Sequence, residues 1–153
     1  MDAEAEERVV TTRREVAADA AVIWELIVEP AEQPRWDGND NLGSAAAGQR
    51  IGAVGDVFAM TLVSGMVRHN HVVEFAERRL VAWRPSEPDR DPPGHLWRWQ
   101  LEPLGAGRTL VTHTYDWTQL TDETRYEKAR STTAERLAAS LERLAAIAEQ
   151  PAR

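Results

Sequence analysis

The sequence lacks cysteine, which excludes disulfide bonds and thiolate metal sites and fits a reducing compartment. It also lacks any apolar run close to the roughly 20 residues that a membrane-spanning helix needs. The acidic start, MDAEAEE, does not show the basic and then apolar pattern of a signal peptide. We therefore expect a cytoplasmic protein without a membrane span.

Positive charge is scarce as well. Among the 153 residues, 25 are acidic and 18 are lysine or arginine, which gives a net charge of −7 at neutral pH. Nucleic acids and anionic membranes are bound through basic surfaces, so neither is the expected partner. The length predicts one domain that can bury a core or enclose a pocket. We expect this domain to span residues 8–150, after a disordered acidic tail of residues 1–7.

Turn-forming residues divide most of the chain into a strand, two short helices and a series of strands. Residues 8–17 are rich in valine and threonine and predict a strand, and Asp19 is the expected N-cap of a helix that Pro30 ends. Further strands, the first of them weak, are expected at residues 49–54, 56–63, 66–75, 80–85, 95–103 and 108–117. Because they recur at hairpin spacing, the sheet should be antiparallel.

The end of the chain has a helical pattern. Residues 122–149 contain neither glycine nor proline and predict one helix of about 42 Å, at 1.5 Å per residue. Its best apolar stripe is Tyr126, Arg130, Thr133, Leu137, Leu141, Leu144 and Ala148. The leucines are typical of a core contact, whereas the mixed first half is typical of a helix that faces a partly polar space.

Three segments carry a resemblance to a known family. They are EVAADAAVIWELIVEPAEQPRW (15–36), VVEFAERRLVAWR (72–84) and WRWQLEPLGAGRTLVTHTYDW (97–117). In this order of elements, the chain resembles the START-related SRPBCC superfamily over residues 8–149, and in particular its bacterial polyketide cyclase/dehydrase-type members. The resemblance implies an α+β helix-grip fold, in which a curved seven-stranded antiparallel sheet surrounds a long C-terminal helix. It also implies a ligand cavity between the sheet and that helix.

The two-residue period of strands then indicates which side chains face this cavity. His69 and His71 share a strand face with Val67, Val73 and Phe75, and all four histidines fall on the apolar phase of their strands. Small-molecule pockets combine apolar walls with a few polar groups, as this face does. The predicted lining is Phe58, Met60, His69, His71, His95, Trp97, Trp99, His113, Tyr115, Trp117, Tyr126, Arg130 and Thr133.

Each of these residues has an ordinary structural alternative. Core packing is the expected role of Trp24 and Trp36, and it is the alternative for the three tryptophans of the predicted lining. For His69 and His71 the alternative is a hydrogen-bonded core histidine or a wrongly assigned face. For Arg130 it is a solvated helix face.

A metal site is the sharper alternative for the histidine pair, since His-x-His on a strand is a ligand geometry. Glu74, however, lies three residues after His71 and so on the opposite face, and His113 belongs to a different strand. The pattern does not gather a third ligand, so we predict neither a metal nor another cofactor.

Two functions therefore remain open. The protein binds a hydrophobic lipid- or polyketide-like molecule as a carrier, sensor or chaperone, or it is a polyketide cyclase/dehydratase-type enzyme. In the enzyme, His69, His71, His113 and Tyr115 would be the general acid/base candidates. A third class is a protein-interaction module that would use the outer surface, like the chaperone activators of the superfamily. The oligomeric state stays open between monomer and homodimer.

Overall fold

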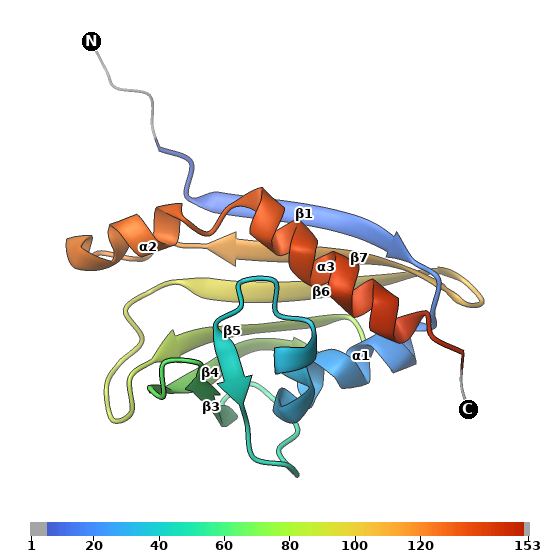
Figure 1. Cartoon of the computed structure of the whole chain (residues 1–153), viewed down its shortest axis with the longest axis horizontal. Coiled ribbons are helices and arrows are strands. Elements are labelled where there is room, and N and C mark those ends of the chain that lie inside the picture. Colours follow the sequence, from blue (N-terminus) through green and yellow to red (C-terminus); the bar gives the residue numbers. More distant parts are fainter. Residues whose placement is uncertain (1–5, 152–153) are drawn as a thin grey trace.

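A computed structural model describes residues 6–151 and shows an α+β fold (Figure 1). Its seven-stranded antiparallel sheet has the strand order β1-β7-β6-β5-β4-β3-β2. The strands are β1 (Val9–Val16), β2 (Leu42–Ser44), β3 (Val57–Leu62), β4 (Val67–Ala76), β5 (Leu80–Ser86), β6 (Leu96–Gly105) and β7 (Arg108–Asp116). The helices are α1 (Ala20–Val28), α2 (Tyr126–Arg130) and α3 (Ala134–Ala148), with short 3-10 helices η1 (Pro30–Arg35) and η2 (Glu123–Arg125). The predicted helix-grip architecture is confirmed.

The strands alternate between an inner and an outer face. In β3, Phe58, Met60 and Leu62 are buried, whereas Val57 and Ala59 are exposed. The β3–β4 hairpin turns at Gly65, whose φ of 92° is costly for residues with a side chain. From β3 to β7, each strand pairs with the next strand in the sequence, and β1 then pairs with β7.

The core lies between the inner face of the sheet and the two longer helices. Figure 1 shows α3 across the sheet beside β1 and β7, with α1 packed against it. The second half of the predicted stripe, Leu137, Leu141, Leu144 and Ala148, is buried in α3 as expected. Burying one such leucine stabilises the fold by about 1.5–3 kcal/mol, so this face attaches α3 to the sheet.

The prediction of one helix over 122–149 is wrong, because the chain breaks between α2 and α3. The Ser131 and Thr132 hydroxyls donate to the Lys128 carbonyl at 2.6 and 3.3 Å. Thr133 then becomes the N-cap of α3 and accepts from the Arg136 backbone N–H. Such hydroxyls compete with the helical hydrogen bonds, so three of them in a row end one helix and start the next.

Two smaller expectations are also corrected. Residues 49–54 form no strand, and the edge strand β2 lies earlier, at Leu42–Ser44. Asp19 occupies the N-cap position of α1 without a side-chain cap. Its carboxylate instead accepts the Gly107 backbone N–H at 2.8 Å, which attaches the start of α1 to the β6–β7 turn.

The ends of the chain are described in part. Most of the predicted disordered tail, residues 1–5, lies outside the described residues. The Glu6 carboxylate is hydrogen-bonded to the Arg130 guanidinium, so this residue contacts the folded domain. None of the helices within residues 6–151 is long and apolar enough to cross a membrane.

Candidate functional site

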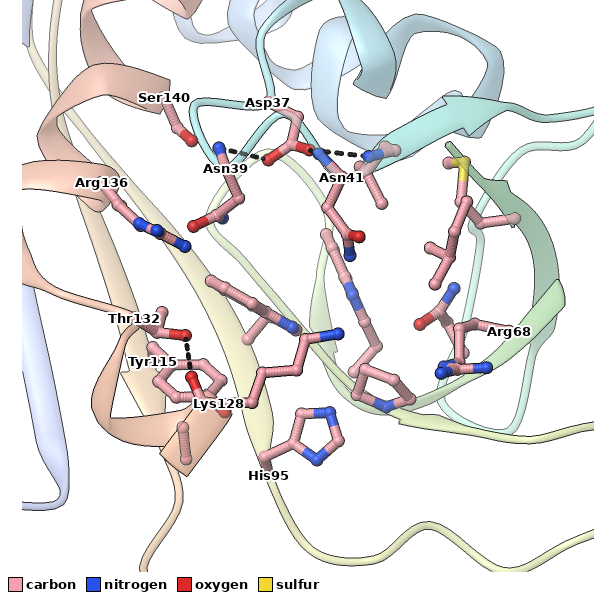
Figure 2. A pocket seen from close by; sticks show the side chains of 18 of the residues that line it. Asp37, Asn39, Asn41, Arg68, His95, Tyr115, Lys128, Thr132, Arg136 and Ser140 are labelled. Carbon is pink, nitrogen blue, oxygen red and sulfur yellow. Dashed lines mark hydrogen bonds between the residues drawn. The ribbon is translucent and has the colours of Figure 1, made fainter. Parts of the chain in front are cut away.

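A cavity of about 310 Å³ lies between the inner face of the sheet, the loop after η1 and the α2–α3 segment (Figure 2). Its floor consists of buried side chains, and its mouth consists of exposed ones such as Lys128 and Arg136. The apolar part of the lining is Trp36, Leu42, Met60, Leu62, Trp83, Pro85, Trp97, Trp99, Leu120 and Ala129.

Aromatic rings form the continuous wall of this cavity. The Trp99 ring stacks on the His113 imidazole with 3.7 Å between the ring centroids, and Trp97 stacks on the other side at 5.6 Å. Trp36 meets Trp99 edge to face at 5.0 Å, and Tyr115 lies 4.5 Å from Trp97. These contacts hold the rings in fixed positions, so the wall is formed before any ligand enters.

His113 is fixed in one protonation state by its surroundings. Its Nδ1–H donates to the Arg98 carbonyl at 3.0 Å, since a carbonyl can only accept. Burial lowers the pKa of His113 to about 3, although this hydrogen bond acts in the opposite direction. The ring is therefore neutral at pH 7, and its Nε2 carries no proton and can accept a hydrogen bond.

The other two titratable rings of the wall are also uncharged at neutral pH. Burial, together with neighbouring positive charges, first that of Arg125, lowers the pKa of His95 to about 4. Burial raises the pKa of Tyr115 to about 12, although its hydrogen bond with Thr132 opposes the shift. The wall thus offers neutral hydrogen-bonding groups on an aromatic surface.

Two buried polar groups of the lining differ in whether they have partners. The Asp37 carboxylate accepts the backbone N–H groups of Asn39, Asn41 and Leu42 at 3.0, 2.8 and 2.9 Å. The Trp99 indole N–H is buried and has no acceptor among the described residues. An unpaired buried donor costs about 1–3 kcal/mol, so the Trp99 N–H lowers the stability of the fold.

Six residues of the predicted lining do line this cavity. They are Met60, His95, Trp97, Trp99, His113 and Tyr115. All six lie on β3, β6 and β7 or directly before β6. In this part of the sheet, side chains alternate between the inner and outer faces without interruption. Whether they bind a ligand stays a prediction.

The face predicted for His69 and His71 is corrected. In the β3–β4 ladder these residues lie opposite Ala59 and Val57, which are exposed, so both rings lie on the outer face. The His71 Nε2 is within 2.9 Å of the Ser86 hydroxyl. In place of the histidines, Arg68 and Asn70 line the cavity.

A β-bulge explains this error. The register of β4 against β5 shifts between Val72 and Glu74, so Val72 and Phe75 both face inward although they are three residues apart. Phe75 packs against Trp24 in the core at 5.8 Å. Counting back from Phe75 in steps of two therefore assigns the wrong face to the residues before the bulge.

The remaining predicted residues lie outside the cavity. Phe58 packs in the core at 5.3 Å from Trp83, and Thr133 caps α3. Trp117 and Tyr126 form a separate cluster, in which the Arg8 guanidinium lies 4.6 and 4.7 Å from the two rings. Arg130 pairs with Glu6 beside the same cluster, at the edge of the molecule.

Sequence reasoning missed the polar side of the lining. Thr132, Arg136 and Ser140 follow one another at the spacing of four that aligns residues along a helix, directly beside the leucine stripe. That spacing could have indicated a polar face of the helix toward the cavity. Lys128, the only lysine of the chain, was another candidate for the lining.

The histidines do not form a metal site in this arrangement. Across residues 6–151, no group of three or more histidine, aspartate or glutamate side chains is placed to hold a metal ion. That the protein binds no metal stays a prediction, which thermal melting with and without a strong chelator would test.

Residues 7–149 match the model of the family described as "Polyketide cyclase / dehydrase and lipid transport". The chain belongs to this family. A relative from Mycobacterium tuberculosis, uncharacterized protein Rv0088, is 29% identical over 107 residues. That match covers 67% of this chain but only 45% of the relative.

Solved structures share the family fold at low sequence identity. Protein MLL2253 from Mesorhizobium loti has a TM-score of 0.67 at 17% identity, and the match covers 92% of this chain and 96% of that one. Protein CV1439 from Chromobacterium violaceum has a TM-score of 0.62 at 17% identity, with 94% and 99% covered. The Aha1 dimer from Colwellia psychrerythraea has a TM-score of 0.61 at 20% identity, with 92% and 96% covered. At these identities the likeness concerns the fold alone.

Proposed function

We propose that this protein binds a hydrophobic, lipid- or polyketide-like small molecule in the cavity between its sheet and its α2–α3 segment. The observation that carries the proposal is the cavity itself, about 310 Å³ in volume and walled by four tryptophans. This volume is within the range of small-molecule pockets, roughly 300–1,000 Å³. The family description, which includes lipid transport, supports the same reading.

The wall provides the energy and the orientation that such binding needs. An apolar ligand is removed from water against the indole rings, which contributes about 25 cal/mol for each Å² buried. The neutral His113 offers its Nε2 as an acceptor in this wall, because its Nδ1–H donates to the Arg98 carbonyl. Such a neutral group orients a ligand hydroxyl without the desolvation cost of a buried charge.

Acid/base catalysis, the enzymatic alternative, fits the same groups less well. An efficient general acid or base has a pKa near the working pH. The pKa of His113 is lowered to about 3 and that of Tyr115 is raised to about 12, both mainly by burial. Among the other candidates, His69 and His71 lie on the outer face. The wall is therefore better suited to binding than to proton transfer at neutral pH.

The proposal is tested with N-phenyl-1-naphthylamine, a neutral apolar dye that fluoresces when it leaves water. We expect saturable binding to the protein, and at least a tenfold loss of affinity in Asn70→Phe, because this ring enters the cavity from β4. The matched control is His69→Phe, which adds the same ring one residue earlier on the outer face and should leave the affinity within twofold. Thermal melting establishes that both variants fold. If the dye does not bind, or binds Asn70→Phe as tightly as the unmodified protein, the proposal is wrong.

A further inference from the structure

The charged groups of the cavity are almost all positive. Arg68 from β4, Arg125 from η2, Lys128 from α2 and Arg136 from α3 line it, whereas Asp37 is its single acidic residue within the described chain. The Asp37 carboxylate is occupied by three backbone N–H groups. This charge is opposite in sign to that of the whole protein, which is −7.

Three of these cations have no carboxylate partner. Arg125 pairs with Asp122 at 3.3 Å. Arg68, Lys128 and Arg136, by contrast, form no ion pair with any acidic residue among residues 6–151. Several arginines outside the cavity are paired, as Arg14 is with a glutamate of α3.

Two of the unpaired cations lie near each other. Figure 2 shows Arg68 from β4 and Lys128 from α2 in the pocket, whereas Arg136 lines it on the side of α3. The pKa of Lys128 is lowered first by partial desolvation and then by the positive charges of Arg68 and Arg125, which are therefore close enough to repel it. Like charges held together in this way are stabilised when an anion binds between them.

The cations also lie at the right depth for one part of a ligand. Lys128 and Arg136 are exposed at the mouth and Arg68 is half-buried, whereas Trp99, His113 and Tyr115 of the aromatic wall are buried. A molecule that fills the cavity thus meets aromatic rings with its inner part and positive charge with its outer end. An acidic group at that end stays near water and avoids the cost of full burial.

We propose that the ligand is an amphipathic anion, whose apolar body lies against the tryptophans while a single carboxylate, phosphate or sulfate group binds between Arg68 and Lys128. This inference rests on the proposed function, since it names the chemical class of the molecule bound in the same cavity. It excludes a purely apolar ligand, for which two neighbouring unpaired cations would have no use.

Two dyes that differ by one acidic group test this inference. N-Phenyl-1-naphthylamine and 8-anilinonaphthalene-1-sulfonate share their ring system, and only the second carries a sulfonate. At low ionic strength we expect the sulfonate to bind at least tenfold more tightly than the neutral dye. The double variant Arg68→Gln/Lys128→Gln should bind the sulfonate at least tenfold more weakly than the unmodified protein does. Its affinity for the neutral dye should change by less than twofold.

Matched variants separate a local charge effect from a general one. Arg13→Gln removes one positive charge from an exposed residue of β1 that does not line the cavity, and should change neither affinity by more than twofold. Arg68→Lys/Lys128→Arg keeps both charges and should keep the preference for the sulfonate. This second pair also shows whether the loss in the glutamine variant comes from charge or from misfolding.

Displacement of the bound sulfonate distinguishes an amphipathic anion from a free one. Dodecanoate should displace it at far lower concentration than 1-dodecanol, acetate or inorganic phosphate. If phosphate displaces it as well as dodecanoate does, the site takes a free anion and the inference is overturned. Equal affinities for the two dyes also overturn it but leave the proposed function intact, whereas failure of both dyes to bind overturns the proposed function.

Discussion

At the scale of single residues, burial decides what the polar groups of the cavity can do. His113 lies between two indole rings and donates to the Arg98 carbonyl, so protonation of its Nε2 would place a charge in an aromatic environment. The same burial keeps the Tyr115 phenol protonated. These residues therefore act as fixed hydrogen-bonding groups, and their charge states link the cavity to the stability of the fold.

The lowered pKa of His113 predicts a loss of stability in acid. Above pH 6.5 the ring is neutral in both states and contributes nothing to the pH dependence. Below pH 6.5 the unfolded chain binds a proton that the folded chain does not accept until about pH 3, so stability falls by about 1.4 kcal/mol for each pH unit. At pH 5 the loss amounts to about 2 kcal/mol relative to pH 7.

His113→Gln should remove this contribution. In urea unfolding at pH 7 and pH 5, the variant is expected to be less stable than the unmodified protein at pH 7, because it loses the stacked imidazole. The difference between the two proteins should shrink by about 2 kcal/mol at pH 5. A difference that stays the same at both pH values would contradict a depressed pKa at this position.

At the scale of elements, the break between α2 and α3 shapes the mouth of the cavity. The cap at Thr133 starts α3 in a new direction, which places Thr132 and Arg136 in the lining instead of Tyr126 and Arg130. The break therefore determines which residues of the C-terminal segment a ligand would meet.

Thr133→Ala tests the contribution of this cap. Loss of the side-chain acceptor for the Arg136 N–H should lower the free energy of unfolding by about 1 kcal/mol. Thr121→Ala is the matched control, since Thr121 is exposed in the loop before η2 and should change stability by less than about 0.5 kcal/mol. Equal effects of the two substitutions in chemical unfolding would argue against the cap.

Local patterns explain which of these elements could be predicted from the sequence. Hairpin turns and the two-residue period of strands depend on residues that are close together in the sequence. The sheet and the inward side chains of β3, β6 and β7 were therefore predictable. The bulge after Val72 is set by pairing with β5, and its effect on His69 and His71 has no local sign. Three hydroxyl residues in a row indicate the break at Thr133 in the sequence. One continuous helix was predicted nevertheless, because the segment contains neither glycine nor proline.

At the scale of the whole molecule, the cavity exists because segments distant in sequence are held against each other. The loop after η1 is attached to α3 by the Gly38 N–H, which donates to the Ser140 hydroxyl at 2.8 Å, and by Arg143, which donates to the Asp37 carbonyl at 2.6 Å. The approach of Arg68 to Lys128 depends on the same assembly. No sequence pattern could predict it, because their elements meet only in the folded sheet and helices.

Gly38 is the point where this assembly is tightest. A Cβ atom at this position would lie 2.5 Å from the Ser140 backbone nitrogen and 2.7 Å from the Arg136 carbonyl oxygen, so Gly38→Ala must push the loop away from α3. We expect a loss of about 1–3 kcal/mol in unfolding free energy, as for overpacked sites, together with weaker binding of N-phenyl-1-naphthylamine because the cavity loses its fixed shape. Gly52→Ala is the matched control, since its Cβ would meet only the Asp56 carboxylate at 3.7 Å, and it should leave both quantities nearly unchanged. Thermal melting and dye titration of the two variants decide the matter, and a Gly38→Ala protein with unaltered stability and affinity would show that the contact between this loop and α3 does not form the cavity.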